Sequence, residues 1–131
     1  MNLNHLGTIN MLIIEDDAFN IQLIRSLLSK ISDTNVIAMD DGSEALKILE
    51  SEEEKIDIVL LDLHLPTMGG KEILGAIRKN EKLNDLPVLI ISVDGMDEIE
   101  LRNMGANDFI LKPFDIDEFA AKISANLKDK K

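Results

Sequence analysis

The sequence predicts an α/β protein with a doubly wound, five-stranded parallel sheet and five helices. Two observations carry this prediction. Five short apolar runs alternate with longer stretches in which apolar residues recur every three or four positions. The short runs are almost continuously apolar, as expected for parallel strands that helices cover on both faces.

The predicted strands are short and bounded by polar residues, glycine or proline. They are residues 11–14, 36–39, 56–61, 88–91 and 109–111. Right-handed crossovers between parallel strands place all their carboxyl ends at one edge of the sheet, where doubly wound proteins bind ligands.

The predicted helices follow the strands in order. The first carries apolar residues at helical spacing between Ile21 and Ile31. The second opens at Gly42-Ser43, and Ser43 is expected to be its N-cap. Gly105 is expected to end the fourth. The last three helices are predicted over residues 71–80, 97–104 and 116–127.

The length of 131 residues fits a single domain. We expect a flexible N-terminal extension over residues 1–8, the domain over residues 9–128 and a frayed C-terminus over residues 129–131. The chain has no cysteine, which excludes disulfides and thiolate metal sites. It also lacks a secretory signal and an apolar run of the roughly 20 residues that span a bilayer, so a cytoplasmic location is expected.

The formal net charge of −11 limits the classes of partner. It disfavours direct binding to nucleic acid or to an anionic membrane, because phosphate groups would be repelled. An acidic surface instead suits a metal ion and protein partners with basic faces.

Polar residues of complementary kinds follow four of the predicted strands: Glu15-Asp16-Asp17, Asp62, Ser92 and Lys112-Pro113. Each has an ordinary explanation alone, since acids cap helices and serine or aspartate is common in turns. Their joint placement at one sheet edge predicts a site for a divalent metal and a phosphoryl group. Asp17 is the acid expected to cap the first helix.

Several short motifs occur in order along residues 11–127. They are Glu15-Asp16, Gly42-x-Glu44-Ala45-Leu46, Asp62-x-x-Leu65-Pro66-x-Met68-x-Gly70, Ser92, Gly105-Ala106-x-Asp108-Phe109 and Lys112-Pro113-Phe114. Together they resemble the receiver (CheY-like) domain of bacterial two-component response regulators. The resemblance implies a flavodoxin-like sheet with strand order 2-1-3-4-5.

The resemblance also implies a role for each strand-end residue. Asp62 is the expected phosphoacceptor, and Mg²⁺ (or Mn²⁺) is expected to offset repulsion between its carboxylate and the phosphoryl group. Asp16 and Asp62 are expected to bind the metal directly and Glu15 through water, with the backbone carbonyl of His64 as a further ligand. The chain is then a self-modifying phosphoacceptor and not an enzyme that turns over a substrate.

Lys112 is expected to face the phosphoryl oxygens, aimed by a cis peptide bond before Pro113. Ser92 is expected to donate a hydrogen bond to the phosphoryl group and, with Phe109, to form a switch, although Phe109 is equally well explained as core. The expected phosphodonor is a sensor histidine kinase or a histidine-phosphotransfer protein. The face formed by the fourth helix, fifth strand and last helix is expected to bind a target or to form a homodimer.

Two residues depart from the family's commonest pattern. Val93 follows Ser92 where a small residue is usual, and His64 lies two residues after the phosphoacceptor. With Asp94, they are expected to tune reaction rates, and His64→Asn is predicted to change autodephosphorylation.

Three alternative functions remain open at this point. The domain could pass its phosphoryl group onward as a shuttle in a multistep relay. A haloacid-dehalogenase-like phosphotransferase would need a second aspartate two residues after Asp62, where His64 stands. A flavin or nucleotide binder would need a Gly- or Ser/Thr-rich phosphate loop, whereas the first loop is Glu-Asp-Asp.

Overall fold

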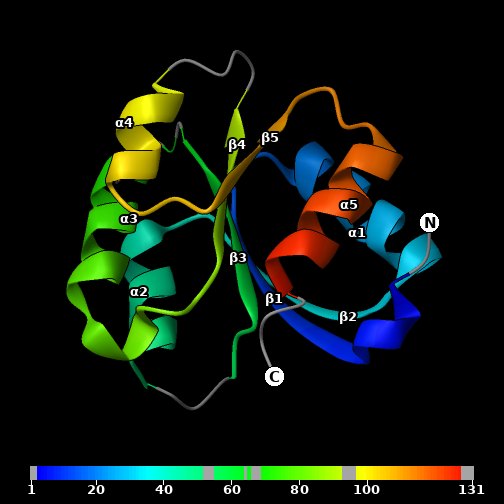
Figure 1. Cartoon of the computed structure of the whole chain (residues 1–131), viewed down its shortest axis with the longest axis horizontal. Helices are drawn as coiled ribbons and strands as arrows, with labels where there is room; N and C mark the ends of the chain where they lie inside the picture. Colours follow the sequence, from blue (N-terminus) through cyan, green and yellow to red (C-terminus); the bar gives the residue numbers. More distant parts are fainter. Residues whose placement is uncertain (1–2, 52–54, 64, 66–68, 93–96, 128–131) are drawn as a thin grey trace.

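The computed structural model describes residues 3–51, 55–63, 65, 69–92 and 97–127. Within these residues, five parallel strands form one sheet in the order β2-β1-β3-β4-β5, as predicted, and helices lie on both of its faces (Figure 1). The strands are β1 (Thr8–Ile14), β2 (Asp33–Met39), β3 (Ile58–Asp62), β4 (Val88–Ser92) and β5 (Asp108–Leu111). The α-helices are α1 (Ala18–Ile31), α2 (Gly42–Ser51), α3 (Gly70–Lys79), α4 (Glu98–Asn103) and α5 (Ile116–Leu127).

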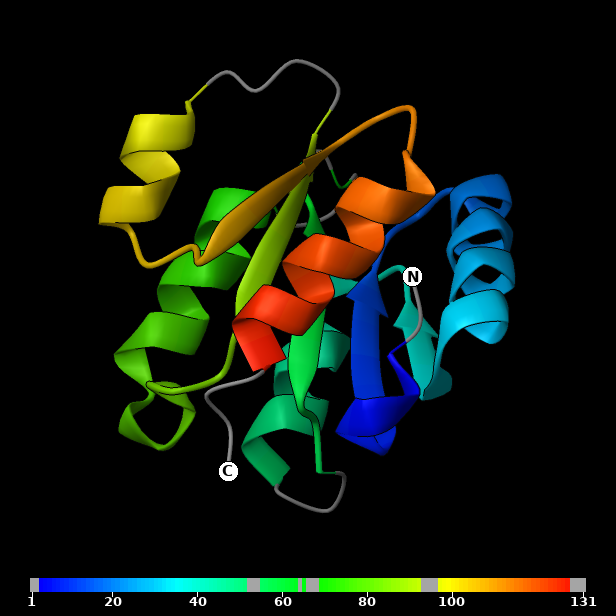
Figure 2. The same cartoon turned by 45° about the vertical axis from the view of Figure 1, so that its right-hand side comes forward.

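The sheet separates two apolar cores. Alternate residues of each strand face α1 and α5 on one side, and α2, α3 and α4 on the other. Figure 2 shows α5 and α1 together on the first of these faces. Strands β3 and β4 are buried along their whole length, which explains why their sequences show no alternation.

Two strands begin earlier than the sequence predicts. Strands β1 and β2 pair in register from Thr8 and Asp33 onward, although both early segments contain polar residues. β2 lies at the edge of the sheet, so its polar side chains remain accessible to water. Pairing with β1 therefore extends the strand beyond its apolar run.

The residues before β1 have structure of their own, in a stretch that the sequence predicts to be flexible. A 3₁₀ turn, η1, covers Asn4–Leu6, and the Leu3 side chain is fully buried in the core beneath α1 and α5. The Leu3 backbone N–H donates a hydrogen bond to the carbonyl of Ile31 at the end of α1. Leu3 thus joins the start of the chain to the domain.

The helix caps agree with the sequence at α1 but not at α2. Asp17 caps α1, as predicted, by accepting a hydrogen bond from the Phe19 N–H at 2.8 Å. The expectation that Ser43 caps α2 is wrong, because Asp41 Oδ1 accepts from the Ser43 N–H at 2.9 Å and from its hydroxyl at 2.8 Å. Asp41 precedes the helix and can reach the first-turn amides, whereas Ser43 already lies within that turn.

The described helices include none with the length and apolar character needed to cross a membrane.

Candidate functional site

Three carboxylates meet at the carboxyl edge of the sheet. Glu15 and Asp16 follow β1, and Asp62 is the last residue of β3. One carboxylate oxygen from each lies within 4.8 Å of the other two. Glu15 and Asp62 are buried and Asp16 is exposed, so the cluster opens to solvent on the Asp16 side.

Strand pairing brings these acids together. Ile14 of β1 pairs with Leu61 of β3, so Glu15 and Asp62 are the next residues along two adjacent strands. The Glu15 N–H extends the pairing of β1 with β2 by donating to the Met39 carbonyl at 2.9 Å. The backbone of Glu15 is therefore held against the end of β2.

Gly70, the first residue of α3, allows that helix to start directly against the end of β3. A β-carbon at Gly70 would lie 2.8 Å from the Leu63 Cα and 3.0 Å from the Asp62 carbonyl oxygen. These are backbone atoms, which cannot move aside as a flexible side chain could. The absence of a side chain at residue 70 is thus a requirement of the Asp62 site.

Burial makes Glu15 the most perturbed acid of the site. Its pKa is raised to about 7, first because burial disfavours the charged form and next because the side chain hydrogen-bonds with Asp62. The nearby cation of Lys112 and the hydrogen bond from the Asp17 N–H oppose this rise. Two crowded carboxylates therefore favour a proton, or another cation, between them.

Lys112 supplies a positive charge on the same side of the site. It follows β5, and its N–H continues the sheet by donating to the Ser92 carbonyl at 2.9 Å. Its Nζ lies 3.5 Å from Glu15 Oε1. The Lys112–Pro113 peptide bond is cis, which agrees with the expectation from sequence.

Ser92 of β4 and Phe109 of β5 lie on adjacent strands and are both buried. Phe109 pairs with Ile90 of β4, and Ser92 is two residues farther along that strand. Side chains two residues apart on a strand share a face. Ser92 and Phe109 consequently belong to the face that α4 covers, which is the arrangement a coupled switch needs.

Three sequence-predicted residues, His64, Val93 and Asp94, lie outside the described residues. This applies to the expected rate-tuning side chains and to the His64 carbonyl expected to bind metal.

Sequence reasoning missed the acidic border of the site. Asp40, Asp41 and Glu44 line a hollow of about 410 Å³ together with Glu15 and Asp16. Asp40-Asp41 directly follows the second strand, so the rule that located the other acids could also have found this pair. The hollow extends the negative surface from β1 to the start of α2.

Comparisons with known proteins show which family the chain is similar to. A model of the response regulator receiver domain family matches residues 11–124. The chemotaxis protein CheY of Pseudomonas aeruginosa is 33% identical over 115 residues, which are 86% of this chain and 91% of that protein. The polar-differentiation response regulator DivK of Brucella ovis is 31% identical over 124 residues, which are 93% of this chain and 98% of that protein.

A solved structure has the same fold. It is the receiver domain of sensor histidine kinase PA1611 from Pseudomonas aeruginosa, determined with a magnesium ion in its active-site cleft. Its TM-score is 0.80 at 24% sequence identity, covering 92% of this chain and 98% of that one. Fold, motif order and relatives together show that the chain belongs to the response regulator receiver domain family of two-component systems.

Proposed function

We propose that Asp62 accepts a phosphoryl group from a phosphohistidine of a sensor histidine kinase or a histidine-phosphotransfer protein. The observation that carries the proposal is the convergence of Glu15, Asp16 and Asp62 within 4.8 Å, with Lys112 3.5 Å from Glu15. Such a cluster suits a doubly anionic group that arrives with a divalent cation. The proposed receiver extends over residues 9–128, and a cytoplasmic location remains a prediction.

The donor set fits Mg²⁺. Its atoms are carboxylate oxygens, which this hard cation prefers. Glu15 Oε1 is buried, lies 3.5 Å from Lys112 Nζ and accepts no hydrogen bond from any residue that the structure describes, so it can accept one from water bound to a cation. Asp16 and Asp62 would hold the ion, with Glu15 acting through water, and the ion would neutralise charge on the phosphoryl oxygens. The related fold of the PA1611 receiver domain contains Mg²⁺ in its cleft.

The transfer step uses the Asp62 carboxylate as the nucleophile. One of its oxygens attacks phosphorus, an O–P bond forms, and the P–N bond to the donor histidine breaks. The imidazole nitrogen keeps the bonding electron pair, and the product is an aspartyl phosphate. Water later hydrolyses this acyl phosphate, which releases inorganic phosphate and restores the carboxylate.

Lys112 and Ser92 would act on the transferred group. The Lys112 ammonium can turn from Glu15 towards phosphoryl oxygens that carry greater negative charge. The Ser92 hydroxyl can donate one hydrogen bond from the end of β4. Movement of Ser92 would open space for Phe109 and alter the face formed by α4, β5 and α5, which would bind a target or a second copy.

Intact-mass measurement after incubation with a small-molecule phosphodonor tests the proposal. Wild-type protein should gain one phosphoryl group with Mg²⁺ and none with a chelator, and Asp62→Asn should gain none. Asp117→Asn is the matched control, because it removes an exposed carboxylate from α5 and should react like the wild type. An unmodified wild-type protein in the presence of Mg²⁺ would reject the proposal.

Adding a histidine-phosphotransfer protein to the phosphorylated chain distinguishes the two modes of signalling. Rapid movement of the phosphoryl group from Asp62 to that protein indicates a relay shuttle. Retention on Asp62 indicates a switch that acts by binding a target.

A further inference from the structure

We propose that Arg102 of α4 is a positioning residue that holds the Phe109 ring in its buried arrangement. It would thereby set the ratio of outward to buried Phe109 rings, and so the state of the Ser92–Phe109 switch, in the protein without a phosphoryl group. The inference rests on the proposed function for its consequence in signalling. The contact itself can be tested without phosphorylation.

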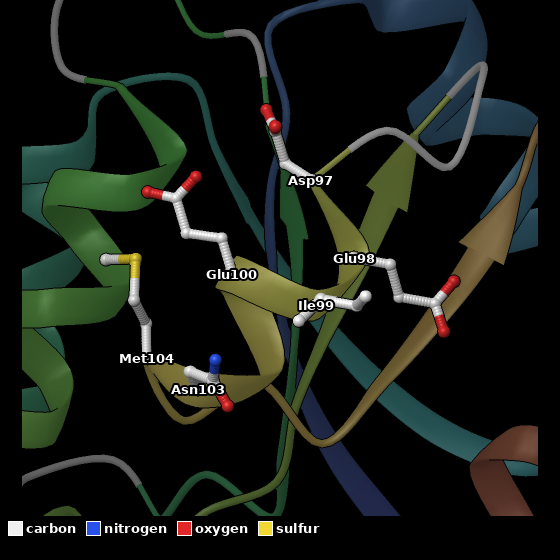
Figure 3. Close-up of a pocket in the computed structure, with 6 residues that line it drawn as sticks. All are labelled: Asp97, Glu98, Ile99, Glu100, Asn103 and Met104. Atoms are coloured by element: carbon white, nitrogen blue, oxygen red, sulfur yellow. The ribbon is translucent and has the colours of Figure 1, made fainter.

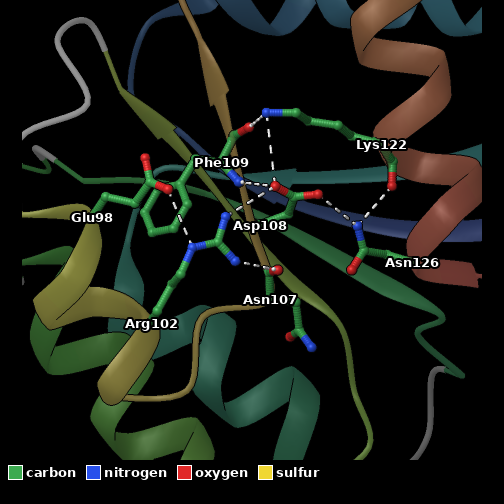
Figure 4. A network of polar contacts seen from close by, with 7 residues as sticks. All are labelled: Glu98, Arg102, Asn107, Asp108, Phe109, Lys122 and Asn126. Carbon is green, nitrogen blue, oxygen red and sulfur yellow. Dashed lines mark hydrogen bonds and ion pairs between the residues drawn. The ribbon is translucent and has the colours of Figure 1, made fainter.

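Arg102 lies over the aromatic ring. Its guanidinium carbon is 4.9 Å from the centroid of the Phe109 ring, within the range of a cation–π contact (Figure 4). Phe109 is only 3% exposed and packs in the core between the sheet and the helices α2, α3 and α4. Arg102 covers the ring from the side of α4, so outward movement of the ring would have to displace it.

Three groups hold the guanidinium in this position. Arg102 Nε lies 3.2 Å from Glu98 Oε2, one helical turn earlier, and Nη2 lies 3.5 Å from Asp108 Oδ1. Nη1 donates a hydrogen bond to the Asn107 carbonyl at 3.3 Å. A planar guanidinium can meet three partners and an aromatic face together, which a lysine ammonium cannot.

Asp108 continues this network into β5 and α5. Its Oδ1 accepts a hydrogen bond from the Phe109 N–H at 2.9 Å and lies 3.7 Å from Lys122 Nζ. Its Oδ2 accepts from the Asn126 side chain at 3.3 Å, and Lys122 also donates to the Phe109 carbonyl. The backbone and the ring of Phe109 are thus held by one network that joins three elements.

Helix α4 is short and places one buried side chain, Leu101, in the core that contains Phe109. It spans only Glu98–Asn103, with Leu101 buried and Ile99 80% exposed. Its outer surface forms an open hollow lined by Asp97, Glu98, Ile99, Glu100, Asn103 and Met104 (Figure 3). At its first turn, Lys71 of α3 pairs with Asp97 at 3.3 Å and Glu100 at 3.0 Å, but these side chains are exposed.

The geometry predicts which position of the Phe109 ring Arg102 favours. The contact stabilises the buried ring, which is also the arrangement expected when Ser92 moves towards a phosphoryl group. Loss of the guanidinium should therefore raise the ratio of molecules with an outward Phe109 ring to molecules with a buried one. We expect a change of roughly two- to fivefold, as for a partly exposed cation–π contact.

Fluorine NMR of protein labelled with fluorophenylalanine tests this inference, because the sequence has only four phenylalanines. In Arg102→Gln, without phosphodonor, the Phe109 resonance should shift and become more sensitive to a water-soluble paramagnetic probe. Arg25→Gln is the matched control, since it removes the same charge from the exposed surface of α1. An Arg102→Gln protein whose Phe109 signal matches wild type in position and probe sensitivity would overturn the inference.

Two further variants separate positioning from general stability. Arg102→Lys keeps the positive charge but lacks the planar guanidinium with its several N–H donors. It should therefore restore only part of the wild-type signal. Glu98→Gln removes the charge of one of the three partners and should give a smaller change in the same direction. This variant tests the inference if Arg102→Gln does not fold. A Glu98→Gln spectrum identical to wild type in that case would contradict the inference.

The outcome is independent of the central functional claim. If no phosphoryl group reaches Asp62, the proposed function fails, whereas the ring measurement still reports on Arg102. If Asp62 is modified but the ring does not respond to Arg102, the positioning role alone fails.

Discussion

At the residue scale, Glu15 shows how burial changes the behaviour of an ordinary acid. Glu15 is 1% exposed, and burial is the first cause of a pKa raised from 4.5 to about 7. At a pH between these two pKa values, Glu15 holds a proton in the folded protein and releases it in the unfolded chain. Stability should therefore fall as pH rises through this range, because the folded state has to give up that proton.

This reasoning predicts the pH dependence of the metal-free protein. The contribution of Glu15 should be complete below about pH 4.5 and lost as pH rises to about 7, a change of roughly 3 kcal/mol in unfolding free energy. Urea unfolding across this pH range measures it, with Glu15→Gln as the comparison. Parallel pH profiles for the two proteins would show that Glu15 does not titrate in this way.

Gly70 and Gly75 provide a second test at the residue scale within one helix. A β-carbon at Gly70 meets the backbone of Leu63 and Asp62, whereas one at Gly75 has no atom within 4 Å. Gly70→Ala should destabilise the protein by about 1–3 kcal/mol through overpacking and slow any reaction at Asp62. Gly75→Ala should stabilise it by roughly 0.5–1 kcal/mol through helix propensity. Equal midpoints in urea for the two variants would contradict the close approach at Gly70.

At the scale of elements, the start of α2 depends on Asp41. This side chain accepts hydrogen bonds from both the amide and the hydroxyl of Ser43, and these bonds lower its pKa. Asp41→Ala should reduce the unfolding free energy by about 1 kcal/mol, as expected for loss of an N-cap. Ser43→Ala should cost less, because the Asp41 carboxylate would still accept from the amide. If urea unfolding shows a larger loss of unfolding free energy for Ser43→Ala than for Asp41→Ala, then Ser43 and not Asp41 caps the helix.

At the scale of the whole molecule, the metal site proposed at the acidic edge predicts that stability depends on divalent cations. Mg²⁺ that binds only the folded protein raises its unfolding free energy, by about 2.7 kcal/mol at one hundred times the dissociation constant. The unfolding temperature of wild type should rise with Mg²⁺, and Asp16→Asn should remove most of that rise. Asp117→Asn is the control and should respond like wild type. An equal rise in wild type and Asp16→Asn would argue against a site at these acids.

The sequence predicted the five strands, because apolar runs that are buried on both faces are distinctive, and the resemblance to receiver domains implied their order. It also predicted that Glu15, Asp16, Asp62 and Lys112 lie at one edge of the sheet, because strand ends are easy to locate and parallel strands share an edge. It missed the early start of β1 and β2, where pairing between strands compensates for a polar sequence. The packing of Leu3 beneath α1 and α5 was missed for the same reason, since it depends on contacts distant in sequence.

The sequence by itself determined the fold class and the residue types at the carboxyl edge of the sheet, since both follow from local periodicity and chain order. Tertiary structure decided which atoms meet. It buried Glu15 beside Asp62, set Lys112 against Glu15 and laid Arg102 over Phe109. These contacts join residues from separate elements, so they depend on helix packing and strand register, which local sequence patterns do not specify.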